Sequence, residues 1–197
     1  MQRRIVKMAN TQVRSREDGR VLEGYFAVFN KEYEVCPGWV ETIAPGAFAK
    51  YLRTGKDTKV LWNHDPNIVL GSTENRTATL SEDSTGLWGS TLLNENDQDA
   101  VNAYARVERG DVTGCSFGFE ISRMEEWWDD EGIYHTIILE VDPLYEVSPC
   151  TFPAYMDTSI MARNREDLRK ARENLAEQRK NHRENWRQEM LRRLKGE

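Results

Sequence analysis

Three short segments of the chain carry residue types that can together break an acyl bond. Residues 114–118 have the pattern Gly-x-Ser-x-Gly around Ser116, and His64, one of only three histidines, lies upstream of them. A serine hydroxyl becomes a nucleophile when a neighbouring base takes its proton, and a neutral imidazole can do this near neutral pH. Glu146, downstream of both, carries a carboxylate that can hold such a ring in one tautomer. Their order along the chain, His, Ser and acid, predicts a catalytic triad.

The Gly-x-Ser-x-Gly pattern is also typical of α/β-hydrolases, in which the serine comes first and the acid and the histidine follow it. After Ser116 this chain has only His135 and His182, and the second of these lies in a highly charged segment. No repeated alternation of strands and helices surrounds the serine. The order of the residues therefore excludes the α/β-hydrolase arrangement.

The third member of the predicted triad is open among three residues. Glu146 can orient the His64 ring and stabilise its imidazolium form. Glu140 offers the same chemistry, and His135 would give a Ser-His-His arrangement. Alternation along the strands does not choose between them while the strand pairing is unknown. We take His64 as the general base, Ser116 as the nucleophile and Glu146 as the orienting acid, and we leave the oxyanion donors unassigned.

Runs of β-branched and aromatic residues bounded by turn residues predict a chain rich in strands. The predicted strands cover residues 23–30, 59–64, 68–72, 86–92, 113–122, 136–141 and 144–148. In the strand around Ser116, apolar side chains at every second position are expected to anchor the strand, so that Ser116 points from the other face. His64 is expected near the end of its strand, which Asp65 and Pro66 end.

Two short helices are predicted between these strands. Residues 45–54 begin with a proline, which the first turn of a helix tolerates, and stop before Gly55, which suits a left-handed cap. A second helix follows the polar residues 96–99 and ends near Gly110. Strands with short helices between them favour the mainly β or α+β class. We predict a closed antiparallel β-barrel with the helices outside it.

The C-terminal segment differs from the rest of the chain in composition. Residues 163–197 carry 12 Lys or Arg against 7 Asp or Glu, whereas residues 1–162 carry 15 against 26. Glycine and proline are absent from 163 to 195, and apolar residues are sparse there. We predict a domain at 1–162, which carries the predicted triad, and a basic tail at 163–197 that forms a long charged helix.

The composition also limits the class of protein. An acidic body is a poor general binder of nucleic acid, although the basic tail has the charge to engage phosphates or an acidic partner surface. Three cysteines without metal-ligand spacing predict reduced thiols in a cytosolic setting, with no zinc and no cofactor. No apolar stretch follows the basic N-terminal residues, so we expect neither a signal peptide nor a membrane anchor.

Together these segments resemble the prohead protease family of tailed bacteriophages, the capsid-maturation serine proteases that are distantly similar in fold to herpesvirus assemblin. The resemblance covers about residues 20–162 and rests on the order and spacing of several elements. They are Gly24-Tyr25-Phe26-Ala27-Val28-Phe29-Asn30, Ile43-Ala44-Pro45-Gly46-Ala47-Phe48, Leu61-Trp62-Asn63-His64-Asp65, Cys115-Ser116-Phe117-Gly118-Phe119, Tyr145-Glu146-Val147-Ser148 and Thr151-Phe152-Pro153-Ala154.

The resemblance implies a β-barrel core with surrounding helices, with His64 and Ser116 as base and nucleophile. It also implies an activity confined to assembling procapsids in the host cytoplasm. Similar proteins cut the scaffolding protein or the scaffold-like region of the major capsid protein, and often themselves. These proteins are the expected partners, and related folds can be dimeric. The basic tail is then expected to bind the scaffold while the shell assembles.

Two other functions stay open at the level of the sequence. The same barrel without catalysis would serve as a capsid-assembly module that binds scaffold, although the presence of His64 and Ser116 argues against it. Binding of nucleic acid through the tail rests on charge alone. Covalent labelling of Ser116 by a serine-directed phosphonate separates a protease from a binding module.

Overall fold

The computed structural model of the chain describes residues 2–6, 12–16, 19–151, 169–174, 176–177, 180–181 and 184. The chain divides into two compact units, residues 1–156 and 157–197. The boundary predicted after residue 162 lies outside the described residues. The division into a domain at 1–162 and a basic tail at 163–197 therefore stays a prediction.

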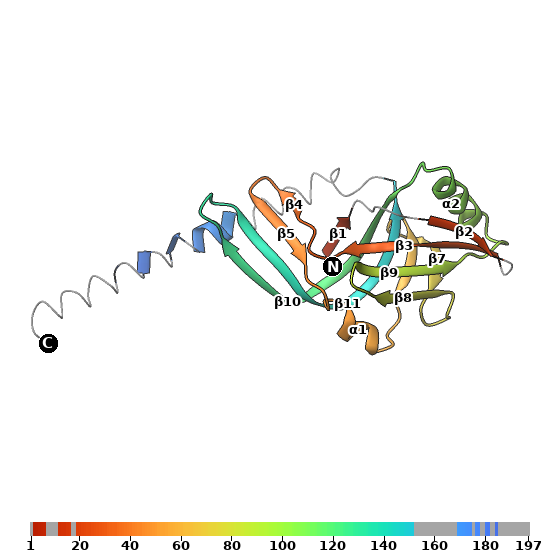
Figure 1. The fold of residues 1–197 in the computed structure, drawn as a ribbon, viewed down its shortest axis with the longest axis horizontal. Helices are drawn as coiled ribbons and strands as arrows, with labels where there is room; N and C mark the ends of the chain where they lie inside the picture. The colour runs from red at the N-terminus through yellow and green to blue at the C-terminus, as the bar shows by residue number, and fades with distance from the viewer. Residues whose placement is uncertain are drawn as a thin grey trace, which may run out of the picture. The chain divides into compact units, whose positions relative to one another are not determined.

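The first unit is mainly β (Figure 1). Its strands are β1 (Gln2–Val6), β2 (Gln12–Arg16), β3 (Gly19–Val28), β4 (Tyr33–Cys36), β5 (Trp39–Ile43), β6 (Lys59–Trp62), β7 (Asp65–Ser72), β8 (Ala78–Glu82), β9 (Gly86–Leu92), β10 (Gly114–Trp128) and β11 (Tyr134–Cys150). Helix α1 (Ala49–Arg53) connects β5 to β6, and helix α2 (Gln98–Glu108) connects β9 to β10. The strands form a sheet of seven and a sheet of four.

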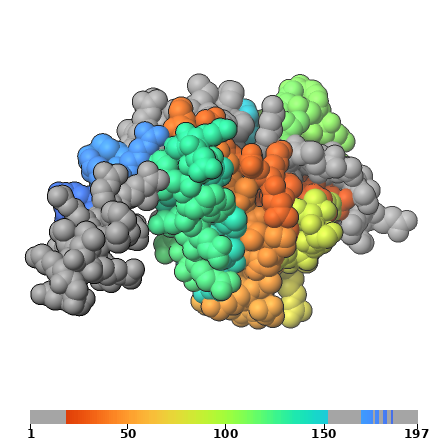
Figure 2. Space-filling view, turned by 60° about the vertical axis from the view of Figure 1, so that its left-hand side comes forward, coloured from red at the N-terminus to blue at the C-terminus, as the bar shows by residue number. Residues whose placement is uncertain are grey.

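The larger sheet is organised around β11, a strand of 17 residues. β10 runs antiparallel along β11, and β1 runs antiparallel along the other edge of β10. On its opposite side β11 pairs first with β5 and then with β6, and both of these pairings are parallel. β4 pairs with β5, and β7 pairs with β6. Figure 2 shows β4 and β5 (orange) side by side with the β10–β11 hairpin (green to teal).

The prediction of a closed antiparallel barrel is wrong. The larger sheet ends at β1 on one side and at β4 and β7 on the other, the smaller sheet has the order β2-β3-β9-β8, and neither closes among the described strands. A barrel needs its first and last strands to pair with a defined stagger. Register shifts between Gly118 and Met124 instead bend and twist the β10–β11 hairpin. The two parallel pairings of β11 also exclude an all-antiparallel sheet.

The core of the unit is built from side chains of both sheets and both helices. The ring of Phe117 on β10 packs edge-on against that of Phe48 at a centroid distance of 5.6 Å, and it lies 4.7 Å from the ring of Phe119. Burying each of these rings stabilises the fold by about 1.5–3 kcal/mol. The predicted apolar face of β10 is confirmed, because Cys115, Phe117 and Phe119 all lie in the core. The strand that carries Ser116 is therefore anchored from its core face.

The predicted start is right for helix α2 and wrong for helix α1. α2 begins as predicted after Asp97, whose carboxylate accepts a hydrogen bond from the Asp99 N–H and so caps the helix. α1 is shorter than predicted because residues 45–48 form turns rather than a first helical turn. A carboxylate from β8 holds these turns in place, since the Gly46 N–H donates to Glu82.

The prediction of a long charged C-terminal helix is wrong. Helical residues described in the second unit are 169–174, with short groups at 176–177, 180–181 and 184. Arg169 and Glu173 form an ion pair one helical turn apart, which adds only a few tenths of a kcal/mol. A sparse apolar stripe provides little surface to bury, so propensity and such pairs are left to hold a helix. The rest of the predicted tail lies outside the described residues.

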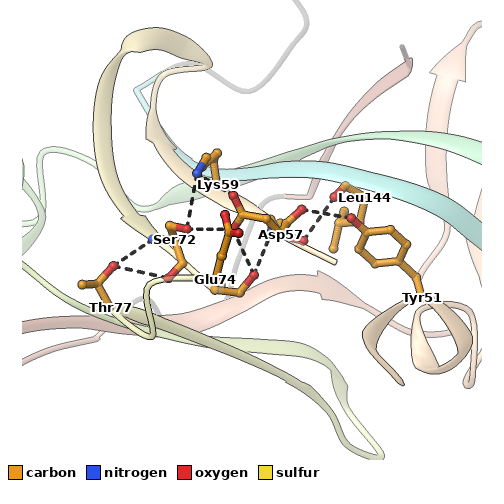
Figure 3. Close-up of polar contacts among 9 residues, drawn as sticks. Tyr51, Asp57, Lys59, Ser72, Glu74, Thr77 and Leu144 are labelled. Atoms are coloured by element: carbon orange, nitrogen blue, oxygen red, sulfur yellow. Dashed lines mark hydrogen bonds and ion pairs between the residues drawn. The ribbon is translucent and has the colours of Figure 1, made fainter. Parts of the chain in front are cut away.

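A partly exposed network around Asp57 holds the start of β6 (Figure 3). Asp57 Oδ1 accepts hydrogen bonds from Ser72 Oγ at 2.7 Å and from the Glu74 N–H at 3.1 Å. Lys59 Nζ lies 2.5 Å from Asp57 Oδ2, and the Tyr51 hydroxyl donates to the Asp57 carbonyl at 3.0 Å. The network thus ties α1, the first residue of β6 and the end of β7 together.

Asp57→Asn is expected to lower the free energy of unfolding at neutral pH by about 1.5–3 kcal/mol, because a hydrogen-bonded charge is lost. Burial alone would raise the pKa of the Asp57 carboxyl, but hydrogen bonds from Lys59 and Ser72 outweigh it and hold the pKa well below the ordinary 3.8. This stabilisation is present above the ordinary pKa and is lost as the pH falls through the folded value. Urea unfolding in steps from neutral pH down to about pH 2 measures both effects.

The matched control for this prediction is Asp130→Asn, because Asp130 is an exposed carboxylate in the turn between β10 and β11. It is expected to change the free energy of unfolding by less than about 0.5 kcal/mol. Equal losses in the two variants, or an Asp57→Asn protein with a wild-type dependence of stability on pH, would show that the Asp57 network does not hold β6.

Candidate active site

His64 lies in a tight turn between β6 and β7. Asn63 and His64 have φ angles of 52° and 62°, and Trp62 pairs with Asp65 across the turn. Two central residues with positive φ form the two-residue hairpin turn whose twist matches that of antiparallel strands. The predicted end of the strand at Asp65 and Pro66 is therefore wrong by two residues. Asn and His are among the few residues other than glycine that tolerate this conformation.

The turn is fastened to the end of β11. The Asn63 N–H donates to the Pro149 carbonyl at 3.0 Å, and the Thr151 N–H donates to Asn63 Oδ1 at 2.7 Å. The Asn63 side-chain amide also donates to Thr151 Oγ1 at 3.2 Å. Because Asn63 is held in this way, the next residue, His64, lies over β11.

The imidazole of His64 contacts the carboxylate of Glu146. Nδ1 of His64 lies 2.7 Å from Glu146 Oε1, and the two side chains are 11% and 3% exposed. A carboxylate only accepts hydrogen bonds, so Nδ1 carries the proton in this contact and Nε2 of the neutral ring carries the lone pair. Nε2 is buried and has no hydrogen-bond partner among the described residues. The ring is therefore held in the tautomer that can accept a proton at Nε2.

The pairing of β10 with β11 brings Ser116 to the same place. Ser116 pairs with Ser148 and Gly118 pairs with Glu146. Directly opposed residues of antiparallel strands share a face, with Cβ atoms about 4.5–5.5 Å apart. The backbone N–H of His64 donates to Ser148 Oγ at 3.3 Å, so His64 lies over that face. The register thus assigns Ser116, which is fully buried, to the face that carries Glu146 and Ser148. His64 Nε2, however, makes no hydrogen bond to the Ser116 hydroxyl.

The two other candidates for the third position make contacts elsewhere. Glu140 Oε1 lies 2.7 Å from Lys50 Nζ and accepts a hydrogen bond from Ser122 Oγ at 3.0 Å. The Lys50 and Ser122 hydrogen bonds lower the pKa of Glu140. His135 Nε2 lies 2.9 Å from Asp129 Oδ2, far along the hairpin from the His64 turn. Of the three candidates, Glu146 is the one whose side chain reaches the His64 ring.

Sequence reasoning missed Ser148, which contacts both Glu146 and the His64 backbone. The signal was present in the segment 144–148, because residues two apart on a strand share a face. Had Glu146 been placed on the site face, Ser148 would have followed it there.

The described residues hold no group of three or more His, Cys, Asp or Glu side chains placed to bind a metal ion. Cys36, Cys115 and Cys150 are buried and carry thiols rather than disulfides. Over the same residues, the structure contains no helix with the length and apolar character needed to cross a membrane.

A histidine held by a carboxylate, over a sheet face to which the register also assigns a serine, is a candidate serine hydrolase site. Residues 9–172 match the family of caudovirus prohead serine proteases, and the chain belongs to this family. It is similar to the prohead protease of Enterobacteria phage HK97, with 30% identity over 158 residues. That match covers 77% of this chain and 64% of the relative, so the chain spans less than two thirds of the relative's length. No solved structure matches the chain.

Proposed function

We propose that this chain is a serine endopeptidase of prohead maturation, with Ser116 as nucleophile, His64 as general base and Glu146 as the acid that orients the base. The observation that carries the proposal is the hydrogen bond between His64 Nδ1 and Glu146 Oε1 on the face to which the β10–β11 register assigns Ser116. Membership of the prohead protease family supports it independently.

The proposed reaction follows from the tautomer of His64. Nε2 takes the Ser116 proton while Oγ attacks the carbonyl carbon of the peptide bond, and the imidazolium then gives that proton to the leaving amine. The acyl-enzyme is hydrolysed by a water whose proton passes to the same Nε2. Glu146 accepts from Nδ1 throughout and stabilises the imidazolium form by its charge. Each step uses the Nε2 lone pair, which no described residue occupies.

As substrates we propose the scaffolding protein or the scaffold-like region of the major capsid protein, and the chain itself. The support is the family and the similarity to a protein named prohead protease. The proposed place of action is the assembling procapsid in the host cytoplasm. We further propose that the basic tail binds the scaffold and that copies of the chain associate with one another.

A second candidate function is a non-catalytic assembly protein that binds scaffold. The complete burial of the Ser116 side chain favours it, because a nucleophile must meet its substrate. The buried Nε2 of His64 argues the other way. An imidazole held by a carboxylate with its second nitrogen unsatisfied is costly to bury unless that nitrogen has a use.

A serine-directed fluorophosphonate is expected to form one covalent adduct per chain, at Ser116, because only an activated hydroxyl attacks phosphorus at a useful rate. Mass spectrometry of the intact chain and of its tryptic peptides measures the stoichiometry and the site. The control is Ser122→Ala, which removes another serine of β10 and should label like the wild-type protein. A chain that takes up no label, or takes it up at random serines, is a binding module.

A further inference from the structure

We infer that Ser148 is a positioning residue of the active site, whose single hydroxyl fixes both the acid Glu146 and the turn that carries His64. The inference rests on the proposed function and adds a residue to it. Ser148 does not touch the reacting atoms in the proposed mechanism, so it acts through its neighbours.

The donor and the acceptor in each hydrogen bond of the Ser148 hydroxyl follow from the number of protons that each group carries. Its Oγ lies 2.5 Å from Glu146 Oε2 and 3.3 Å from the backbone nitrogen of His64. A backbone N–H can only donate, so Ser148 Oγ accepts there. The one hydroxyl proton is then directed to Glu146 Oε2, which as a carboxylate oxygen can only accept. Ser148 is fully buried, so no solvent competes for either bond.

The bond to Glu146 settles the orientation of the carboxylate. The terminal torsion of a glutamate is broad and roughly two-fold, so one hydrogen bond leaves its plane loosely defined. Here Oε1 accepts from His64 Nδ1 at 2.7 Å while Oε2 accepts from Ser148. With both oxygens engaged, the carboxylate cannot rotate without breaking one of the bonds. The plane of the His64 ring is fixed through it.

The second hydrogen bond of Ser148 holds the backbone of His64, whereas Glu146 holds its ring. His64 has a φ of 62°, a left-handed conformation that needs support in a residue with a side chain. Ser148 Oγ holds the backbone of His64, and Glu146 holds its ring. Since Ser148 also holds Glu146, one hydroxyl couples both constraints. Its removal is expected to loosen the backbone and the ring together.

The position of Ser148 in the sheet also relates it to the proposed nucleophile, Ser116. Ser148 is the register partner of Ser116, so the proposed nucleophile and the positioning hydroxyl lie directly opposite each other on adjacent strands. A change that shifts His64 relative to β11 at Ser148 therefore shifts it relative to Ser116 as well. Distances between nucleophile and base govern the rate of proton transfer.

The test compares Ser148→Ala and Ser148→Cys with the wild-type protein on a peptide taken from a cleaved capsid precursor. Both variants are expected to lower kcat on the order of 10-fold with KM unchanged, which is the effect of losing one hydrogen bond to a charged group. The cysteine variant keeps the shape of the side chain with a somewhat larger atom and supplies only a weak donor, so it reports on the hydrogen bond without the cavity that the alanine variant leaves.

The pH profile separates positioning from a purely structural role. The Ser148 hydroxyl draws charge from Glu146, so its removal strengthens the attraction of the carboxylate for the His64 imidazolium. The acidic limb of the kcat/KM profile is then expected to move to higher pH in both variants. The low-field proton resonance of His64 Nδ1–H is expected to shift in the same variants. A structural role would move the unfolding midpoint and leave these two readouts in place.

Ser122→Ala is the matched control, because Ser122 also donates to a carboxylate, that of Glu140, away from His64. It is expected to leave kcat and the pH profile at wild-type values. A Ser148→Cys protein with wild-type kcat and an unmoved pH profile overturns the inference. Ser116→Ala keeps the two proposals distinct. If it abolishes cleavage, the peptidase assignment stands whatever Ser148 does, and if it does not, that assignment fails on its own.

Discussion

Ser116→Ala is expected to reduce cleavage of the capsid precursor by about six orders of magnitude in kcat, because the acyl-enzyme can no longer form. What remains is the modest acceleration that substrate binding and oxyanion donors supply without a nucleophile. The side chain is fully buried on a strand anchored by Phe117 and Phe119, so removing one oxygen leaves the packing of the core face untouched. Gel analysis of proheads assembled with the variant measures the loss directly.

The control for this loss is again a serine of the same strand. Ser122→Ala changes the same chemical group six residues along β10, on an exposed part of the hairpin, and should process the precursor at the wild-type rate. Equal free energies of unfolding for the two variants exclude a folding defect. If proheads that contain Ser116→Ala mature normally, Ser116 is not the nucleophile, and another residue of the chain performs that role.

Strand β10 shows which features of the fold can be predicted from the sequence and which cannot. Alternation alone predicts that Cys115, Phe117 and Phe119 face the core, because side chains of a strand point to opposite faces in turn. The alternation places Ser116 on the other face without saying which strand lies beside it. Near the turn the register partners of β10 and β11 are close in sequence, but register shifts between Gly118 and Met124 separate that end from the site, where Ser116 pairs with Ser148. Local patterns do not encode this distant register. The error of the closed barrel has the same origin.

The turn at His64 shows a different limit. Pro66 was expected to end the strand, because proline cannot donate a ladder hydrogen bond. It lies instead inside β7, which pairs only with β6 among the described strands and so stands at an edge of the sheet. An edge strand tolerates a missing N–H on its outer side. The turn forms two residues earlier, where Asn63 tolerates a positive φ.

The choice between Glu140 and Glu146 depended on one contact that the sequence does not reveal. Both residues lie on β11, separated by roughly 20 Å along an extended strand. Which of them meets His64 is decided by where β6 joins β11. The structure pairs Lys59 with Glu146 and Val60 with Val147, so the hairpin that carries His64 starts beside Glu146. The Asp57 network fixes that starting point by holding Lys59.

Glu146→Gln is expected to lower kcat by about four orders of magnitude, the effect of presenting the wrong imidazole tautomer. The carboxylate accepts from two donors, His64 Nδ1 and Ser148 Oγ. An amide of the same shape has one accepting oxygen and one donating nitrogen. When its nitrogen faces His64, Nδ1 must accept, and the ring proton moves to Nε2. The base then has no lone pair for the Ser116 proton, and the imidazolium loses its counter-charge.

Glu140→Gln and His135→Gln are the matched controls for this prediction, because each replaces one of the competing candidates by a neutral amide. Glu140 contacts Lys50 and Ser122, and His135 contacts Asp129, so both variants should keep wild-type kcat. Steady-state cleavage of one peptide by all three proteins, with their unfolding curves, makes the comparison. A Glu146→Gln protein that stays active beside an inactive Glu140→Gln or His135→Gln protein would move the acid to that residue. In that case β6 would have to pair with a different part of β11 in the active protein, so that His64 could reach the other residue.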